Sequence, residues 1–365
     1  RECLLAVREA LGNYEMPDAR EGWAMGVGVA CSYKNVGLGI GMDDSGGARA
    51  EILGDGSILL RIGSVDMGQG ANSAMAQILS AELGWPFGRI RVHSADTKLD
   101  PWAGMTTASR QTFVTGNAVL EAAQKLKEKI GETVRAEYGV PDREIEIREN
   151  AVYGAGGGER IVTLEDFVRR LEERGITLSA ESRYTAPETR FSLKEPKEGY
   201  QSPAEGHLHA AYCFAAQATV LEVHKTSGRV KVHDVFLASD AGRMINRAAV
   251  EGQMEGGVVM GLGYALSEEY REKDEGILTD TYAKLGLRRI GETPRIHCSV
   301  IENTHPHGPF GAKGMGELPI SMGAPTVVHG IHDALGVWIH SLPVLPDKIL
   351  RALEEKGGTG KPTGP

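Results

Sequence analysis

The pattern of apolar and polar positions divides the chain into short strand-like runs and longer helical segments. Strands are predicted where apolar and polar residues alternate, or where a brief apolar run lies between turn residues: 23–34, 49–62 (a hairpin), 90–94, 210–224, 229–239 and 296–301. Helices are predicted where apolar residues recur every three or four positions: 1–11, 73–83, 118–138, 164–174, 248–265 and about 320–337. In the first helix, Leu4, Leu5, Val7 and Leu11 are expected to share the apolar side.

One succession of elements occurs twice along the chain. A hairpin, a glycine-rich loop, a helix and a further strand run through 49–94 and again through 210–301. Paired hairpins are typical of antiparallel sheet. No GxGxxG follows a first strand, so a parallel dinucleotide-binding sheet fits poorly. The sequence therefore predicts an α+β fold of two related lobes, each with a mixed or antiparallel sheet and packed helices.

The two copies of this unit flank a more charged stretch, and together they suggest a division of the chain. The chain begins with Arg1, and a helical pattern is already running there, so we expect it to continue a longer protein. We expect, in order, an N-terminal helix and linker that follows a missing upstream half, a first lobe, a charged connecting subdomain, a second lobe and a disordered tail: 1–22, 23–140, 141–200, 201–355 and 356–365.

Composition excludes several classes of protein. The formal net charge of −9 over 365 residues argues against an electrostatic nucleic-acid binder. No apolar run is long enough to span a bilayer, and the N-terminus has no signal-peptide pattern, so no membrane partner is expected. The four cysteines are far apart and form no CxxC pair. We interpret them as buried free thiols in a reducing compartment, and we expect a cytoplasmic protein.

Glycine-rich loops carry the candidate chemistry. The segment 308–317 has four glycines in nine residues and ends at Glu317, whose carboxylate could act as a base or could only complement the dipole of the following helix. The segment 104–116 is expected to be a polar loop rich in Thr and Ser. Several helices follow such loops directly. Their N-termini could bind a large phosphorylated anion together, or they could be ordinary capped ends. No Walker-type lysine follows these glycines.

Two glutamines lie in similar settings. Gln69 lies between Gly68 and Gly70, and Gln253 lies in a glycine-containing helical segment. A glutamine amide donates and accepts hydrogen bonds at once, which suits a ligand of mixed character such as a pterin. For Gln253 a structural interpretation of the nearby glycines, as positions where a helix packs closely, is equally good.

Four segments carry a resemblance to a known family. The segments 55–70, 106–118, 240–263 and 308–317 resemble, in order and spacing, the molybdenum cofactor-binding subunit of the xanthine dehydrogenase/aldehyde oxidase family. The resemblance runs from about Trp23 to about Leu353 and corresponds to the C-terminal half of that subunit, with the family's cofactor-binding fold. This chain departs from the family's pattern at Arg247 and Leu318, where relatives commonly have proline, and both changes concern loop geometry.

The resemblance implies a role for individual residues. It implies that Glu317 is the active-site base beside molybdenum, and that no side chain ligates the metal directly, because the dithiolene of the pterin holds it. It also implies a set of residues that bind the cofactor: Gly68, Gln69, Gly70, Thr106, Thr107, Ser109, Gln111, Thr112, Gln253, Lys313 and Gly314.

The resemblance further implies a reaction and partners. The substrate would be a small molecule, either an aldehyde or a xanthine-like N-heterocycle, oxidised with oxygen derived from water. Electrons would leave through 2Fe–2S clusters and FAD on partner chains or domains. The other expected partner is the N-terminal half of the subunit, in a dimer of heteromers, and this chain alone should be inactive. The cofactor would be molybdopterin, with or without a cytosine nucleotide.

Other interpretations remain open on the sequence. The chain could be a non-catalytic scaffold that keeps the fold and a cofactor. The pairs His207/His209 and His305/His307 could each contribute two ligands to zinc, although neither has a third ligand nearby in the sequence. Asp96 and Asp100 could form a carboxylate pair, but turn formation is the more common role for such residues.

Overall fold

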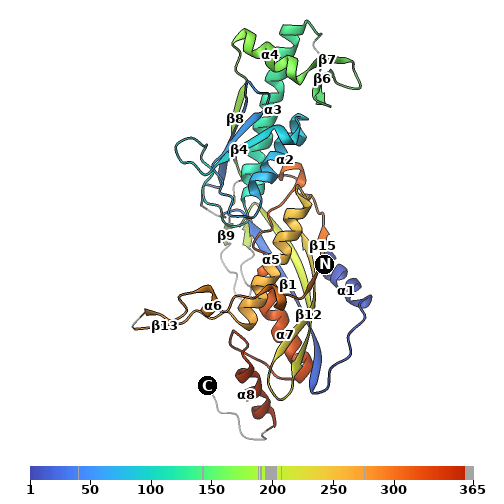
Figure 1. Ribbon diagram of the computed structural model, residues 1–365, viewed down its shortest axis with the longest axis vertical. Coiled ribbons are helices and arrows are strands. Elements are labelled where there is room, and N and C mark those ends of the chain that lie inside the picture. The colour runs from blue at the N-terminus through green and yellow to red at the C-terminus, as the bar shows by residue number, and fades with distance from the viewer. Residues whose placement is uncertain are drawn as a thin grey trace.

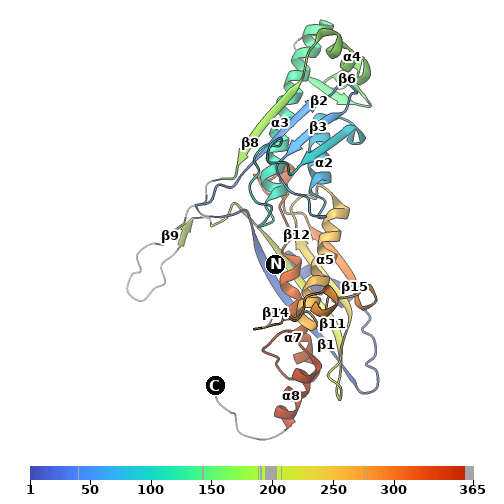
Figure 2. The same cartoon turned by 60° about the vertical axis from the view of Figure 1, so that its left-hand side comes forward.

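The computed structural model describes residues 1–39, 41–141, 144–187, 189, 191–193, 204–206, 208–274 and 276–357, with the backbone only at 191–193 and 204–206. Two lobes follow one another along the long axis of the molecule, with α4 (Leu164–Arg174) at one end and α8 (Pro346–Gly357) at the other (Figures 1 and 2). Each lobe contains a four-stranded sheet. The expected tail at 356–365 begins inside α8, and residues 358–365 lie outside the described part.

The sheet of the first lobe has the strand order β4-β3-β2-β8. The hairpin of β2 (Ser45–Ile52) and β3 (Ile58–Ile62) turns at Gly56, whose φ of 77° suits glycine. The strand β4 (Ile90–Ser94) lies parallel to β3, and β8 (Ser179–Thr185) lies antiparallel to β2. The helices α2 (Ala71–Leu83) and α3 (Gln111–Tyr138) pack against each other, and α3 also packs on β2 and β8. Their apolar sides form one core with the sheet.

The second lobe repeats this plan with the strand order β1-β11-β12-β15. Here β11 (Ala211–His224) and β12 (Val230–Asp240) form the hairpin, β15 (Arg295–Ile301) lies parallel to β12, and β1 (Trp23–Val36) lies antiparallel to β11. The helices α5 (Arg247–Leu266) and α7 (Gly323–Leu335) pack together, and α7 covers β1 and β11. The predicted α+β fold of two related lobes with mixed sheets is confirmed.

The two lobes differ in where their fourth strand comes from. In the first lobe β8 follows the other strands in the chain, whereas in the second lobe β1 precedes them by a long distance. The pairing therefore differs from the expected ranges, since β1 belongs to the second sheet, although it was expected in the first lobe at 23–140. Likewise β8, expected in the connecting subdomain at 141–200, is a strand of the first sheet. Strand pairing over such separations is decided by tertiary packing and leaves no local pattern.

The remaining elements are short. One small sheet, with α4, extends the first lobe beyond α3, and other short strands and turns connect the main elements. Their bounds are β5 (Ile145–Arg148), β6 (Ala151–Gly154), β7 (Arg160–Thr163), β9 (Phe191–Leu193), β10 (Ala204–Gly206), β13 (Glu272–Lys273), β14 (Gly276–Ile277), α6 (Tyr282–Leu285), and the 3-10 turns η1 (Phe87–Arg89), η2 (Ile290–Glu292), η3 (Pro309–Gly311) and η4 (Pro319–Met322).

The helix α1 (Glu2–Gly12) packs on the face of the second sheet formed by β11 and β12. Cys3 and Val7 are its buried residues, whereas the side chains of Leu4 and Leu5 are 43% and 39% exposed. The predicted apolar side was therefore wrong for these two leucines but right for Val7, because the side that meets the sheet is formed by Cys3, Val7 and the partly buried Ala6, Ala10 and Leu11. The prediction of buried thiols holds for Cys3 and Cys213, but Cys31 is exposed. Among the described helices, none has the length and apolar character needed to cross a membrane.

Candidate functional site

A pocket of about 340 Å³ lies where loops and helix starts from both lobes meet. Its volume is at the lower end of the range for small-molecule sites. The first lobe contributes the segments before α2 and α3, and the second lobe contributes the loop before α5 and the segment that ends at Glu317. Of the sequence-predicted site residues, Gly68 does not line the pocket, and the others do: Gln69, Gly70, Thr106, Thr107, Ser109, Gln111, Thr112, Gln253, Lys313, Gly314 and Glu317.

The carboxylate of Glu317 is held through one of its two oxygens. The Ser109 hydroxyl donates to Oε2 of Glu317 at 2.9 Å, and Nζ of Lys34 lies 3.3 Å from the same oxygen. The backbone N–H of Glu317 donates to the Ser109 hydroxyl at 3.2 Å. Within the described residues Oε1 makes no hydrogen bond or ion pair. The side chain of Glu317 is 44% exposed, so Oε1 is accessible from the pocket.

The backbone around Ser109 fits closely against the glycine-rich segment. Ala108 and Ser109 both have positive φ angles, 50° and 49°, which non-glycine residues adopt rarely. A Cβ atom on Gly314 would lie 1.5 Å from the carbonyl oxygen of Ser109. Gly314 therefore serves the close packing of two loops, and this packing brings Glu317 to Ser109. The sequence predicts cofactor binding for Gly314, and the structure adds this packing role.

We expect Gly314→Ala to destabilise the protein by about 1–3 kcal/mol, because the added methyl overlaps backbone atoms that are fixed by both loops. The free energy of unfolding, measured in urea, checks this. Gly256→Ala is the matched control, since a Cβ at that position of α5 has no neighbouring atom within 4 Å and alanine should stabilise the helix. A Gly314→Ala protein as stable as wild type would contradict the packing role.

The glycine loop before α2 is closed by its own side chains. The carboxylate of Asp66 accepts from the N–H groups of Gly68, Gly70 and Asn72 at 2.9, 3.3 and 2.9 Å. Burial raises the pKa of Asp66, but these backbone donors outweigh burial and hold the pKa below its usual range. The amide of Gln69 also bonds within the loop, donating to the carbonyl of Val65 at 2.9 Å. The start of α2 is therefore capped by a carboxylate.

Gln253 differs from Gln69 in this respect. Its amide makes no hydrogen bond within the part of the chain that the structure describes, although it lines the pocket beside Gly316. A Cβ at Gly316 would lie 3.4 Å from Oε1 of Gln253. At the start of α5, the Asn246 side chain accepts from the N–H of Ala249 at 3.0 Å and caps the helix. Gln253 is thus the glutamine whose amide can bond a ligand without breaking an internal contact.

The Thr/Ser segment is shorter than predicted, because α3 begins at Gln111 and includes 111–116. The Gln111 side chain is buried and donates to the Met105 carbonyl and to the Thr106 hydroxyl, at 3.0 and 3.2 Å. The Thr106 hydroxyl also accepts from the N–H of Val65 at 2.9 Å. Among the described contacts, the hydroxyls of Thr107 and Thr112 have no hydrogen-bond partner. These two hydroxyls are the ones that this segment leaves for a ligand.

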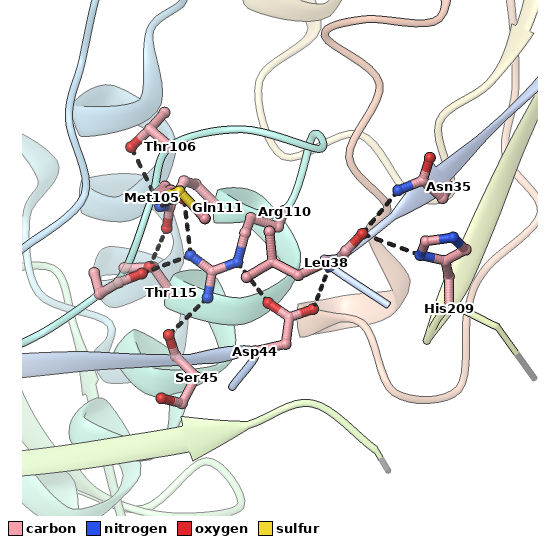
Figure 3. Close-up of polar contacts among 12 residues, drawn as sticks. Asn35, Leu38, Asp44, Ser45, Met105, Thr106, Arg110, Gln111, Thr115 and His209 are labelled. Atoms are coloured by element: carbon pink, nitrogen blue, oxygen red, sulfur yellow. Dashed lines mark hydrogen bonds and ion pairs between the residues drawn. The ribbon is translucent and has the colours of Figure 1, made fainter. Parts of the chain in front are cut away.

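A buried arginine that sequence reasoning did not assign to the site supports this segment. Figure 3 shows the Arg110 guanidinium between the Asp44 carboxylate and the Ser45 carbonyl, at 2.5 and 2.6 Å. Arg110 also donates to the carbonyls of Ala103 and Met105 at 2.5 and 3.0 Å. Its side chain is fully buried. The available signal was an arginine directly after the Thr/Ser run, but its partner lies 66 positions away.

Lys313 is also held by an internal partner. Its Nζ donates to Oδ2 of Asp240 at 2.7 Å, and the two side chains are 8% and 5% exposed. The Lys313 N–H donates to the Ala241 carbonyl, and Gly242 forms a β-bridge with Ala312. The expectation that Lys313 binds the cofactor therefore meets a competing structural role, because this pair joins the loop after β12 to the glycine-rich segment.

The alternative metal and carboxylate sites find little support. His207 lies outside the described residues. The ring centroids of His305 and His307 are 5.9 Å apart. Among the described residues, no group of three or more His, Cys, Asp and Glu could hold a metal ion. Asp96 accepts from the N–H groups of Lys98 and Leu99, so it forms the turn that was the favoured interpretation.

Comparison with known proteins bears on this pocket. The model of the molybdopterin cofactor-binding domain family matches residues 7–294, well over half of the chain. The chain belongs to this family. Among its relatives is a probable xanthine dehydrogenase subunit from Bacillus subtilis (strain 168), 29% identical over 334 residues, which are 91% of this chain and 42% of the relative. A probable hypoxanthine oxidase of Escherichia coli (strain K12) is 27% identical over 97% of this chain and 35% of its own length.

The fold comparison agrees with the family. The aldehyde oxidoreductase from Desulfovibrio gigas superposes with a TM-score of 0.73 at 25% identity, over 97% of this chain and 34% of that chain. The chain thus spans less than half the length of these relatives. The resemblance drawn from the sequence is confirmed.

The pocket has features that fit a molybdopterin. The unbonded Gln253 amide and the hydroxyls of Thr107 and Thr112 offer donors and acceptors for a pterin. The open Oε1 of Glu317 faces the same cavity.

Proposed function

We propose that this chain forms the cofactor-binding part of a molybdenum hydroxylase that oxidises an aldehyde or a xanthine-like N-heterocycle with oxygen derived from water. One observation carries the proposal: a single pocket between the lobes contains both an unbonded glutamine amide, Gln253, and an accessible carboxylate oxygen, Oε1 of Glu317. The first suits a pterin and the second suits proton transfer. Family membership supports this assignment.

The chain's own residues would bind the cofactor and manage a proton. Gln253 would bond the pterin, with Thr107, Thr112 and the loop at Gln69 and Gly70 lining the same cavity. When bound, the molybdenum-containing group would supply the Lewis acidity and the two-electron redox chemistry. Ser109 and Lys34 hold Oε2 of Glu317, so Oε1 would accept the proton from the water-derived oxygen. The Ser109 hydroxyl fixes the direction of the carboxylate.

In this proposal, other protein segments or chains supply the groups that the reaction needs and that this chain lacks. The curated relatives are more than twice as long as the region they share with this chain. We propose that an N-terminal half completes the pocket, and that 2Fe–2S and FAD partners carry the electrons away, in a dimer of heteromers. The cofactor is proposed as molybdopterin, in its simple or its cytosine dinucleotide form.

The test is the metal and pterin content of the full protein purified from its own source with its partner chains. We expect close to one molybdenum per copy of this chain by elemental analysis, and one pterin released on denaturation. Substrate-dependent bleaching of the iron–sulfur absorbance would then establish turnover. Molybdenum and pterin without any substrate-dependent reduction would favour a cofactor-carrying scaffold, and a protein free of both would refute the proposal.

A further inference from the structure

The charged side chains that line the pocket are internally neutralised, with one exception. Of the four charged lining residues in the described part of the chain, Arg110 pairs with Asp44, Lys313 pairs with Asp240 and Glu317 pairs with Lys34, at 2.5, 2.7 and 3.3 Å. The fourth is Arg243, whose guanidinium makes no hydrogen bond or ion pair with any described residue. An arginine keeps its charge at any ordinary pH, so the pocket contains an uncompensated positive charge.

The backbone of Arg243 is fixed although its side chain is free. Its N–H donates to the Gly311 carbonyl at 3.1 Å, next to the bridge between Gly242 and Ala312. Gly242 has a φ of 61°, and a Cβ there would lie 2.4 Å from the Gly311 oxygen. Arg243 therefore stands on an anchored turn that lines the pocket, with its side chain exposed to solvent. A guanidinium placed in this way loses less entropy on binding a ligand than one on a mobile loop.

The helix starts at the pocket do not replace this charge. Asp66 already occupies the N-terminus of α2, and Asn246 caps α5. Of the three described helix starts that line the pocket, that of α3, with Thr112, is the one whose N–H groups no side chain caps. The sequence suggested that several helix N-termini together would bind a large anion. Since two of them are satisfied internally, the arginine is the main source of positive potential that remains for a ligand.

We propose that Arg243 binds the phosphate end of the cofactor, as a charge-assisted contact to a phosphate or diphosphate group. The planar guanidinium group matches the spacing of phosphate oxygens, so arginine forms strong bidentate hydrogen bonds with phosphate. The inference rests on the proposed function for the identity of the ligand. It assigns the phosphate end to the loop between β12 and α5, whereas the pterin end lies with Gln253 and the catalytic end with Glu317.

The experiment measures binding of inorganic pyrophosphate, by titration calorimetry, to the full protein with its partner chains, produced in a host that cannot make the cofactor. Wild type is compared with Arg243→Gln and Arg243→Lys. The control is Arg247→Gln, because Arg247 is four residues away, is exposed, does not line the pocket and pairs with Glu251 at 2.7 Å. We expect Arg243→Gln to weaken binding about tenfold to a hundredfold, Arg243→Lys to weaken it less, and Arg247→Gln to match wild type.

Two outcomes overturn the inference: a wild type that does not bind pyrophosphate, or an Arg243→Gln protein that binds within about twofold of wild type. A separate arm, with protein from the native source, analyses the released cofactor. A nucleoside monophosphate freed by acid hydrolysis would show that the bound group carries a diphosphate, and a pterin phosphate alone would show that it carries a monoester; the variants then test whether Arg243 binds it. If the native protein contained no molybdenum or pterin while Arg243 still governed pyrophosphate binding, the proposed function would fail and the phosphate site would stand.

Discussion

Glu317→Gln should lower the turnover of the assembled enzyme by about a hundredfold to ten-thousandfold, the range that loss of a general base usually produces. Glutamine keeps the size of the side chain, and its amide oxygen can still accept from the Ser109 hydroxyl at the present Oε2 position. The amide nitrogen that replaces Oε1 cannot accept a proton. The effect should therefore appear in kcat, while the molybdenum and pterin contents stay at wild-type values. Steady-state kinetics and metal analysis on the same preparation measure both.

Glu255→Gln is the control for this change. Glu255 lies on α5 close to Gln253, but its side chain is exposed and does not line the pocket. The Glu255→Gln enzyme should have the same turnover rate as wild type. If Glu317→Gln kept more than about a tenth of the wild-type turnover, far above the residual rate expected after losing a base, Glu317 would not be the base. A variant that had lost its cofactor would point instead to a role for Glu317 in loop structure.

Arg110→Gln should remove about 3–5 kcal/mol from the free energy of unfolding, the usual cost of breaking a buried ion pair from one side. The substitution would leave the Asp44 carboxylate, whose side chain is only 11% exposed, without its countercharge. It would also remove donors from the carbonyls of Ser45 and Met105, which Figure 3 labels, and from that of Ala103. Because Ala103 and Met105 belong to the segment that presents Thr107 and Ser109, cofactor content should fall as well. Denaturant unfolding of the cofactor-free protein isolates the stability effect.

Arg91→Gln provides a matched comparison in the same lobe. Arg91 pairs with Asp55 at 2.5 Å, the same separation as the Arg110 pair, but both partners are exposed, at 63% and 51%. The loss of this pair should change the free energy of unfolding far less than the loss of the Arg110 pair, since water solvates and screens both exposed charges. Equal losses for the two variants would mean that burial of the Arg110 pair contributes nothing beyond a surface contact.

Several helices and the repeated unit could be predicted from local sequence. The helix predicted at 164–174 has the observed bounds of α4, because Thr163 caps it, accepting from the N–H of Asp166, and Gly175 ends it in the left-handed region. The hairpin predicted within 49–62 was equally local, since the turn at Gly56 separates two alternating runs. The four segments that carry the family resemblance could be found because each is continuous in the chain. For the same reason many residues of the pocket could be named, and the roles that the resemblance implies for them stay predictions.

The tertiary structure decided which of the polar side chains in the pocket have internal partners and which can contact a ligand. Lys313 and Gln69 were both expected to bind the cofactor, yet one is paired with buried Asp240 and the other bonds its own loop. The guanidinium of Arg243, a residue that the sequence did not single out, has no partner among the described residues. The sequence by itself determined the repeated α+β unit, because helix and strand periods are local properties of the chain. It could not determine the assignment of β1 to the second sheet, the pairing of Arg110 with Asp44, or the charge that remains in the pocket. Those features depend on contacts between residues tens to hundreds of positions apart, and such contacts are chosen by packing and by the cost of leaving a buried charge unpaired.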